Sequence, residues 1–431
     1  MIGEEMHSLA KTLWGLNRSI TGSGVRDTLS ILAQYVAGIV VHEVPTGTAV
    51  FDWVIPKEWK VNDAYLIAPN GEKLCSFKDN NLHLVGYSSP LRTKLPLSVL
   101  QKNLYSLPDQ PQAVPYITSY YKEHWGFCLS QVQRDGLEDG EYEVMIDSEL
   151  FDGSLTYAEL FIPGETEEEV LISTYICHPS MANNELSGPV VTTYLAKWLL
   201  GVAGRRYSYR FVFLPETIGS VTYLSRNYQH LKLKVIAVFN VTCVGDDRSY
   251  SYLPSRNGET ISDHVARHVL KHISPNYRSY TWADRGSDER QYCAPGIDLP
   301  IASIMRSKYG AFPEYHTSLD DLVNVVTPSG LQGGYSALKR AIEVLESNRY
   351  PKVKVLCEPQ LGKRGLYPSL STKHSASEVK LMMDLISWCD GSKSLLDIAE
   401  LCGVPTWHLY PICDVLLGSD LLTLSADPFL A

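Results

Sequence analysis

Apolar and polar residues follow helical spacing near the N-terminus and strand spacing after residue 50. Residues 4–16 and 25–37 carry apolar side chains at the three- and four-residue intervals of amphipathic helices, and the glycine-rich sequence TGSG separates them. From residue 50, short runs of Val, Ile, Trp and Tyr are interrupted by Pro and Gly, and the sequence PNG favours a β-hairpin. Residues 51–150 are therefore predicted to form a mostly β inserted domain.

Strands and helices alternate after residue 153. The apolar and β-branched runs LTYAELFIPG, EVLISTYIC, YSYRFVFLP, VIAVFN and LPIASIMR predict strands. Helical spacing predicts helices at 187–200, 220–231, 260–272 and 329–347. This alternation is typical of a doubly wound α/β fold with a mainly parallel sheet flanked by helices. Residues 1–50 and 151–350 are predicted to share that α/β domain.

The C-terminal part of the chain predicts a separate small domain. Residues 351–374 resemble an irregular linker, and 375–431 contain three helical patterns (377–389, 394–402, 405–418) followed by the strand-like LLTL. This arrangement is winged-helix-like. Residues 375–431 hold two Lys against eight Asp and Glu, a net charge of −6, which disfavours a phosphate-binding face. Packing or protein contact is the expected role of this domain.

Composition narrows the class of protein further. The net charge of −10, from 38 basic and 48 acidic residues, disfavours nucleic acid and anionic membranes as partners. Nine cysteines without a CxxC pair predict neither a disulfide framework nor a structural zinc knuckle. No secretory signal or membrane-length apolar stretch is evident. A cytoplasmic protein is expected. The sequence does not determine its oligomeric state, and a homo-oligomer is one of the possibilities.

Polar side chains recur where the predicted strands end. His178 follows EVLISTYIC, Glu216 follows YSYRFVFLP, Asp288 precedes LPIASIMR, and His316 lies beyond that strand. Open α/β sheets bind ligands at the carboxyl ends of their strands. Each residue also has a structural alternative, because a His after a strand is commonly hydrogen-bonded, Glu216 could favour a helix N-terminus, and Asp288 could cap a turn or pair with Arg290. Four such residues together favour a site.

These segments, in this order, resemble a known superfamily. STYICHPSMANNELSG, FLPETIGS, FNVTCVG, RGSDERQY and EYHTSLDDL are similar to the segments of zinc-dependent aminopeptidases of the carboxypeptidase-like superfamily. VFDWVIPKEW, SLPDQP and SYYKEHWGFCL more closely resemble bacterial aminopeptidase-like proteins found near polysaccharide and natural-product biosynthesis genes. That resemblance covers nearly the whole chain. It implies a zinc-peptidase-like fold with a β-rich insert beside the active site and a C-terminal winged helix.

The chain departs from the two-zinc pattern at three acidic positions. The bridging Asp of the two-zinc enzymes is replaced by Asn184, the second Glu of an adjacent pair by Thr217, and a further Asp by Thr242. A new carboxylate, Glu185, stands one position beyond Asn184. The remaining ligands suffice for one ion and not for two, because catalytic zinc takes about three protein ligands and an open position.

The resemblance therefore implies one Zn²⁺, held by His178, Glu185 and His316, with Asn184 as a weaker candidate for the third ligand. Zinc lowers the pKa of a bound water from ~15.7 towards ~7, and Glu216 is expected to deprotonate that water as general base. Asp288 is expected to orient an imidazole or a substrate amine.

Four further residues are candidates at or near the site. Tyr309 and Arg306 precede His316 and could bind a substrate carboxylate or a developing oxyanion, with local packing as the alternative. Arg18 could reach the site from the N-terminal turn. Cys177 next to His178 suggests a Cys–His dyad, but neighbouring residues of a strand point to opposite faces, which disfavours it.

The leading functional hypothesis is a mononuclear zinc amide hydrolase that acts on a small molecule or short peptide, such as an aminoacyl or sugar-linked compound. One alternative keeps the metal but catalyses cyclisation or acyl transfer. Another is a non-catalytic binding or scaffold protein, which the lost acidic ligands favour and the retained Glu216 disfavours.

Overall fold

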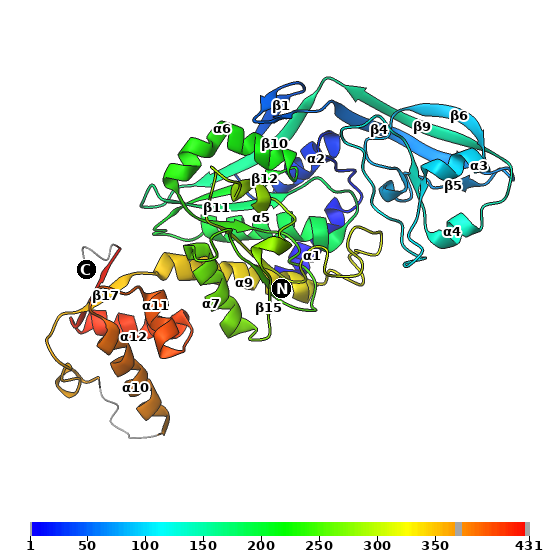
Figure 1. The fold of residues 1–431 in the computed structure, drawn as a ribbon. Coiled ribbons are helices and arrows are strands. Elements are labelled where there is room, and N and C mark those ends of the chain that lie inside the picture. Colours follow the sequence, from blue (N-terminus) through cyan, green and yellow to red (C-terminus); the bar gives the residue numbers. More distant parts are fainter. Residues whose placement is uncertain (1, 367–372, 427–431) are drawn as a thin grey trace. The chain divides into compact units, whose positions relative to one another are not determined.

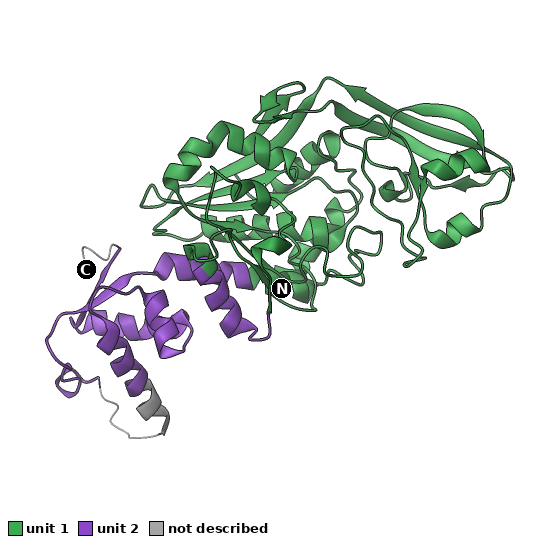
Figure 2. Ribbon diagram, viewed as in Figure 1, with its two compact units in different colours: residues 1–263, 278–336 green, residues 264–277, 337–431 purple. Residues whose placement is uncertain are grey.

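The computed structural model describes residues 2–366 and 373–426. Two compact units divide the chain: residues 1–263 with 278–336, and residues 264–277 with 337–431 (Figure 2). The first unit contains both the α/β part and the β-rich part, so the predicted boundaries at residues 51 and 150 stay a prediction. No helix within the described ranges is long and apolar enough to span a lipid bilayer.

An eight-stranded mixed sheet forms the centre of the first unit (Figure 1). The strands in spatial order are β1 (Val40–Pro45), β10 (Ser154–Ile162), β12 (Ser208–Leu214), β11 (Glu169–Tyr175), β13 (Val235–Asn240), β16 (Ile301–Met305), β14 (Ser251–Leu253) and β15 (Arg278–Ser279). The four strands from β12 to β16 run parallel, whereas β1, β10 and β14 pair antiparallel with their neighbours. Every residue of β11 is buried, as expected of a central strand of a covered sheet.

Helices of the first unit lie at positions that the sequence predicts: α1 (Ile2–Leu13), α2 (Ser23–Leu32), α5 (Ser187–Leu200), α6 (Ile218–Lys234) and the start of α9 (Pro328–Ser347). The short helix α8 (Glu289–Tyr292) was not predicted. The first ten residues of α5 are all buried, because this helix packs against β11 and β12 on one side and against α1 on another. The predicted α/β architecture is therefore confirmed.

Strands are the main regular elements of residues 49–151, as the sequence predicts. The strands are β2 (Ala49–Val50), β3 (Trp53–Val54), β4 (Glu58–Ile67), β5 (Lys73–Leu74), β6 (Leu91–Pro96), β7 (Leu104–Tyr105), β8 (Phe127–Cys128) and β9 (Glu141–Phe151), with short helices α3 (Leu97–Leu100) and α4 (Gln131–Asp135). Four of them make an antiparallel sheet in the order β5-β4-β9-β6. The PNG sequence forms the predicted hairpin turn between β4 and β5, where Gly71 has a φ of 86°.

The second unit contains most of α7 (Ile261–Ile273), the end of α9, and the helices α10 (Lys373–Trp388), α11 (Leu395–Cys402) and α12 (Thr406–Gly418). The three predicted C-terminal helices and the LLTL strand, β18 (Leu422–Ser425), are all present. The predicted linker differs, because it begins with β17 (Tyr350–Val353), which pairs antiparallel with β18. Residues 367–372 and 427–431 of the predicted linker and domain lie outside the described residues.

Candidate active site

A pocket of about 300 Å³ lies at the carboxyl ends of the parallel strands. His178 follows β11, Glu216 follows β12, and His316 lies on the loop after β16. The structure thus brings three of the predicted site residues to one pocket. Its lining comprises aromatic, aliphatic and polar residues of the first unit: Ile20, Trp53, Tyr116, Thr118, Tyr120, Tyr121, Cys177, His178, Glu216, Thr217, Ile218 and His316.

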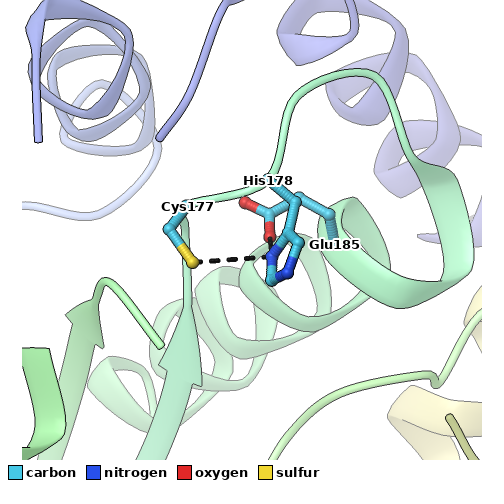
Figure 3. A group of neighbouring side chains, drawn as sticks. All are labelled: Cys177, His178 and Glu185. Atoms are coloured by element: carbon cyan, nitrogen blue, oxygen red, sulfur yellow. Dashed lines mark hydrogen bonds and ion pairs between the residues drawn. The ribbon is translucent and has the colours of Figure 1, made fainter. Parts of the chain in front are cut away.

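Glu185 lies beside Nδ1 of the His178 ring (Figure 3), and Glu216 lies nearest the other ring nitrogen, Nε2. Nδ1 of His178 is 2.9 Å from Oε2 of Glu185, whereas Nε2 is 3.7 Å from Oε2 of Glu216. A short π-helical turn, Ala182–Leu186, carries Glu185 into this position. Glu185 therefore occupies the place of a carboxylate that orients an imidazole, and its predicted role as a direct ligand stays a prediction.

Arg18 completes a buried charged group behind His178. Its Nε donates to the carbonyl oxygen of His178 at 3.0 Å and lies 3.2 Å from Oε1 of Glu185, and both charged side chains are fully buried. Burial lowers the pKa of Arg18, while the carboxylate of Glu185 opposes that shift. Burial also lowers the pKa of His178, but the hydrogen bond and charge of Glu185 and the charge of Glu216 outweigh it, so the net shift is upward.

Cys177 holds the backbone of Glu216 by a hydrogen bond. Its Sγ accepts the backbone N–H of Glu216 at 3.1 Å and lies 3.5 Å from Nδ1 of His178 (Figure 3). The opposite-face argument was wrong here, because β11 ends at Tyr175 and residues 177 and 178 no longer follow strand geometry. Burial raises the pKa of this thiol well above its ordinary value, which disfavours a thiolate nucleophile.

His316 presents an unpaired ring nitrogen. Its Nε2 is buried without a hydrogen-bond partner, and its backbone has a φ of 57°, in the left-handed region that non-glycine residues rarely adopt. Tyr315 stacks on the imidazole at 3.9 Å between ring centroids. Burial, followed by the charge of His178, lowers the pKa of His316 to about 3, so the ring is neutral at physiological pH. The centroids of the His178 and His316 rings are 5.5 Å apart.

Asp288 acts on the turn that carries Glu216. Its Oδ1 accepts the backbone N–H of Thr217 and the hydroxyl of Ser220, both at 2.7 Å. Thr217 has a φ of 64°, so Asp288 stabilises a strained backbone directly after Glu216. Burial and then the charge of Glu216 raise the pKa of Asp288 to about 7. Burial also raises the pKa of Glu216. Asp288 lies against this turn and not against an imidazole.

The positions that lost acidic residues form a neutral network. The hydroxyl of Tyr175 donates to Oδ1 of Asn184 at 3.0 Å and lies 2.6 Å from Oγ1 of Thr242. All three side chains are buried. Uncharged groups bonded to one another offer no charge to a second cation, which agrees with the one-ion limit deduced from the sequence.

The three predicted substrate-binding residues do not line this pocket. Tyr309 donates its hydroxyl to Glu289 at 2.6 Å, and Arg306 stacks on Tyr250 and donates to the carbonyl of Ser249. Arg18 reaches the site, as expected, but is buried behind His178. Tyr116 and Tyr120, which line the pocket, were missed by sequence reasoning, because nothing in the chain distinguishes them among 26 tyrosines.

The pocket offers two imidazole nitrogens to a divalent metal ion, although within the described residues no group of three potential ligands that lie close together includes His316. The unpaired Nε2 of His316 and the Nε2 of His178 are imidazole nitrogens, which zinc favours. Within the described residues, two groups of three potential ligands lie close together: Cys177 with His178 and Glu185, and His268 with His272 and Glu400. The second group is less suited to a metal, because His268 bonds Glu400 through Nδ1 and accepts the N–H of Thr406 at Nε2.

Comparisons with known proteins agree with this fold. Residues 7–348 match the model of a family described as "Domain of unknown function (DUF4910)", and residues 348–424 match a winged helix-turn-helix family. A Clostridium acetobutylicum protein, provisionally named a polysaccharide biosynthesis protein with an aminopeptidase-like domain, is 44% identical over 426 residues, covering 98% of this chain and 96% of its own.

Solved structures show the same architecture. The crystal structure of a C. acetobutylicum protein provisionally called a peptidase has a TM-score of 0.92 at 43% identity, covering 98% of this chain and 96% of its own. A zinc aminopeptidase from Bacillus subtilis has a TM-score of 0.59 at 13% identity, covering 80% of this chain and 94% of its own. The second likeness concerns the fold alone. The predicted fold class, winged helix included, is confirmed.

Proposed function

The chain belongs to the family described as "Domain of unknown function (DUF4910)" and has an aminopeptidase-like fold, and from this premise we propose that it is a mononuclear metal-dependent hydrolase of amide bonds. The observation that carries the proposal is the meeting of Glu216 and two imidazole nitrogens at one pocket. The pocket volume of about 300 Å³ suits a small aminoacyl or sugar-linked substrate.

His178 and His316 are the residues that would hold the ion, which we propose to be zinc. When bound, such an ion polarises a carbonyl group and acidifies water. Two imidazoles are one protein ligand fewer than the three of an ordinary catalytic zinc site. We therefore expect an exchangeable ion rather than a tightly retained one.

Glu216 has the position and environment of a general base. Its carboxylate borders the pocket and lies 3.7 Å from Nε2 of His178. Burial raises its pKa above the ordinary glutamate value, which brings it closer to the range in which a carboxylate both accepts and returns a proton at neutral pH. In the proposed reaction Glu216 takes the proton of the attacking water and delivers it to the leaving amine.

Other charged residues position these groups. Glu185 holds the ring of His178 so that Nε2 faces Glu216, and Arg18 fixes both the carboxylate and the backbone of this pair. Asp288 holds the turn at Thr217, and with it the backbone that carries Glu216. These are positioning roles, because none of the three residues lines the pocket.

Metal analysis combined with one variant tests the proposal. Protein purified without chelators and dialysed against buffered zinc is expected to contain zinc and to hydrolyse members of an aminoacyl-anilide panel. Glu216→Gln should keep the metal and lose at least 100-fold in turnover, the magnitude typical of a general base. Glu72→Gln, at an exposed hairpin position, is the matched control. Absence of metal, or full turnover by Glu216→Gln, would reject the proposal.

The neutral network around Tyr175 favours a second candidate, a binding protein without catalysis. Asn184 and Thr242 bond with Tyr175 instead of offering charge to a metal. In that case the purified protein would bind small ligands, contain no metal, and show no turnover that depends on Glu216. The same measurements therefore distinguish the two candidates.

A further inference from the structure

The β-rich part of the chain contributes a segment to the wall of the pocket. The backbone N–H of Tyr116 donates to the carbonyl of His316 at 2.9 Å, and Val114 and Ser318 exchange two further hydrogen bonds. These contacts fix the segment against the loop that carries His316. The ring of Tyr116 lies 5.2 Å from the ring of His178 and 5.2 Å from that of His316, measured between centroids.

Tyr116 and Tyr120 form a hydrogen-bonded phenol pair in this wall. Their hydroxyl oxygens are 2.7 Å apart, and both residues line the pocket with Glu216. A phenol has one O–H donor, so one hydroxyl donates to the other and a single O–H remains. Within the described residues, neither phenol has another hydrogen-bond partner. The remaining O–H is therefore available to a ligand in the pocket.

The charge of the pocket limits what that ligand is. No lysine or arginine is among its lining residues, and Glu216 is the one carboxylate there. When no metal ion is bound, a ligand carboxylate would meet Glu216 with no lysine or arginine in the lining to neutralise either charge, which is unfavourable in a partly buried site. Arg290 acts on Glu216 from outside the lining, where it donates to Oγ1 of Thr217 at 3.1 Å. A neutral carbonyl group, or a carbonyl group next to an ammonium, meets no such penalty.

We propose that the Tyr116–Tyr120 pair donates its free O–H to the carbonyl oxygen of an uncharged or cationic acyl amide, and that the pocket rejects ligands with a carboxylate at that position. The reaction at this carbonyl rests on the proposed function, whereas the binding preference does not. A neutral donor directed at a carbonyl oxygen stabilises it more as negative charge develops there. Tyr116 and Tyr120 then take the role that the sequence suggested for Tyr309 and Arg306.

Binding measurements on the full-length protein test this assignment. Alaninamide and leucinamide are titrated by calorimetry beside alanine and leucine into protein dialysed against a chelator, which measures the binding preference of the side chains alone. The same probes are incubated with zinc-loaded protein, and mass spectrometry reports whether the amides are cleaved. We expect each amide to bind at least about tenfold more tightly than its acid. The double variant Tyr116→Phe/Tyr120→Phe should lose about tenfold in amide affinity, the equivalent of one hydrogen bond.

The double variant is expected to fold, because removing both partners of a hydrogen bond leaves no unpaired group. Its Tm is measured in parallel. Tyr105→Phe is the matched control, since that phenol bonds His124 and does not line the pocket. Equal or tighter binding of the acids, no binding of any probe, or unchanged amide affinity in the double variant would each overturn the assignment. Amide binding that depends on the tyrosines, without cleavage, would reject the proposed hydrolysis but support the assignment of the Tyr116–Tyr120 pair.

Discussion

Oε2 of Glu185 lies 2.9 Å from Nδ1 of His178, and this contact determines which nitrogen of the imidazole faces the pocket. A carboxylate beside Nδ1 favours the tautomer protonated there, which leaves the lone pair on Nε2. The same carboxylate is paired with Arg18, so the orientation of His178 is coupled to a fully buried ion pair.

Replacing Glu185 with Gln should destabilise the protein strongly. The substitution keeps the shape of the side chain but leaves the charge of Arg18 buried without its partner. Breaking a buried ion pair in this way costs about 3–5 kcal/mol. Denaturant unfolding of Glu185→Gln measures the loss, with Glu72→Gln as an exposed control. A loss below about 1 kcal/mol would contradict the assigned pairing.

Asp288→Asn should change how stability depends on pH. The pKa of Asp288 is about 7 in the folded protein, against an ordinary aspartate value of 3.8 in an unfolded chain. Between these values the folded state holds a proton that the unfolded state has released, so wild-type stability falls as pH rises from about 4 to 7 and levels off above.

Asparagine cannot titrate, so the stability difference between Asp288→Asn and wild type should shift in favour of the variant across that same window. Unfolding midpoints measured from pH 4.5 to 8.5 test this, with the exposed Asp147→Asn as control. A pH-independent difference would show that Asp288 is ionised throughout the range.

His316→Ala should abolish zinc binding without unfolding the protein. The ring supplies one of only two imidazole nitrogens at the pocket, and its Nε2 makes no hydrogen bond that folding would lose. Zinc content after dialysis against buffered zinc is the measurement, and His408→Ala, at an exposed position on α12, is the control. Wild-type zinc content in His316→Ala would remove this residue from the ligand set.

Gly188→Ala should destabilise the fold by about 1–3 kcal/mol through overpacking. A Cβ atom at this position would lie 2.5 Å from the carbonyl oxygen of Val241 and 2.5 Å from Oγ1 of Thr174. Gly418→Ala, where a Cβ meets no atom within 4 Å, is the matched helical control and should be neutral or slightly stabilising. Equal stability of the two variants would contradict the close packing of α5 on the sheet.

Gly188 also shows what the sequence could and could not predict. The spacing of residues 187–200 predicts a helix, but it does not predict that this glycine lets the helix approach Thr174 and the backbone of Val241. His178, Glu216 and His316 were predictable, because each follows a strand of a parallel sheet. Glu185 was predicted as a metal ligand beside His178, but the sequence could not decide its role, since a separation of seven residues is compatible with either a shared ion or the hydrogen bond to Nδ1.

The tyrosine pair illustrates a second limit of the sequence. Tyr116 lies 200 positions before His316, and only the folded chain brings the two segments together. The pattern of residues 51–150 predicts strands and turns, but local periodicity does not predict which distant loop a segment contacts.

The reach of Arg18 has a practical consequence for anyone who shortens this protein. A version that starts after residue 20 would lack the guanidinium that neutralises Glu185 and holds the backbone of His178. Such a fragment would lose one apolar lining residue, Ile20, and keep every polar side chain that lines the pocket, and it would still fail as an enzyme or a binder. Loss of function on truncation would then result from the broken buried ion pair behind His178, and not from the loss of a segment that binds substrate.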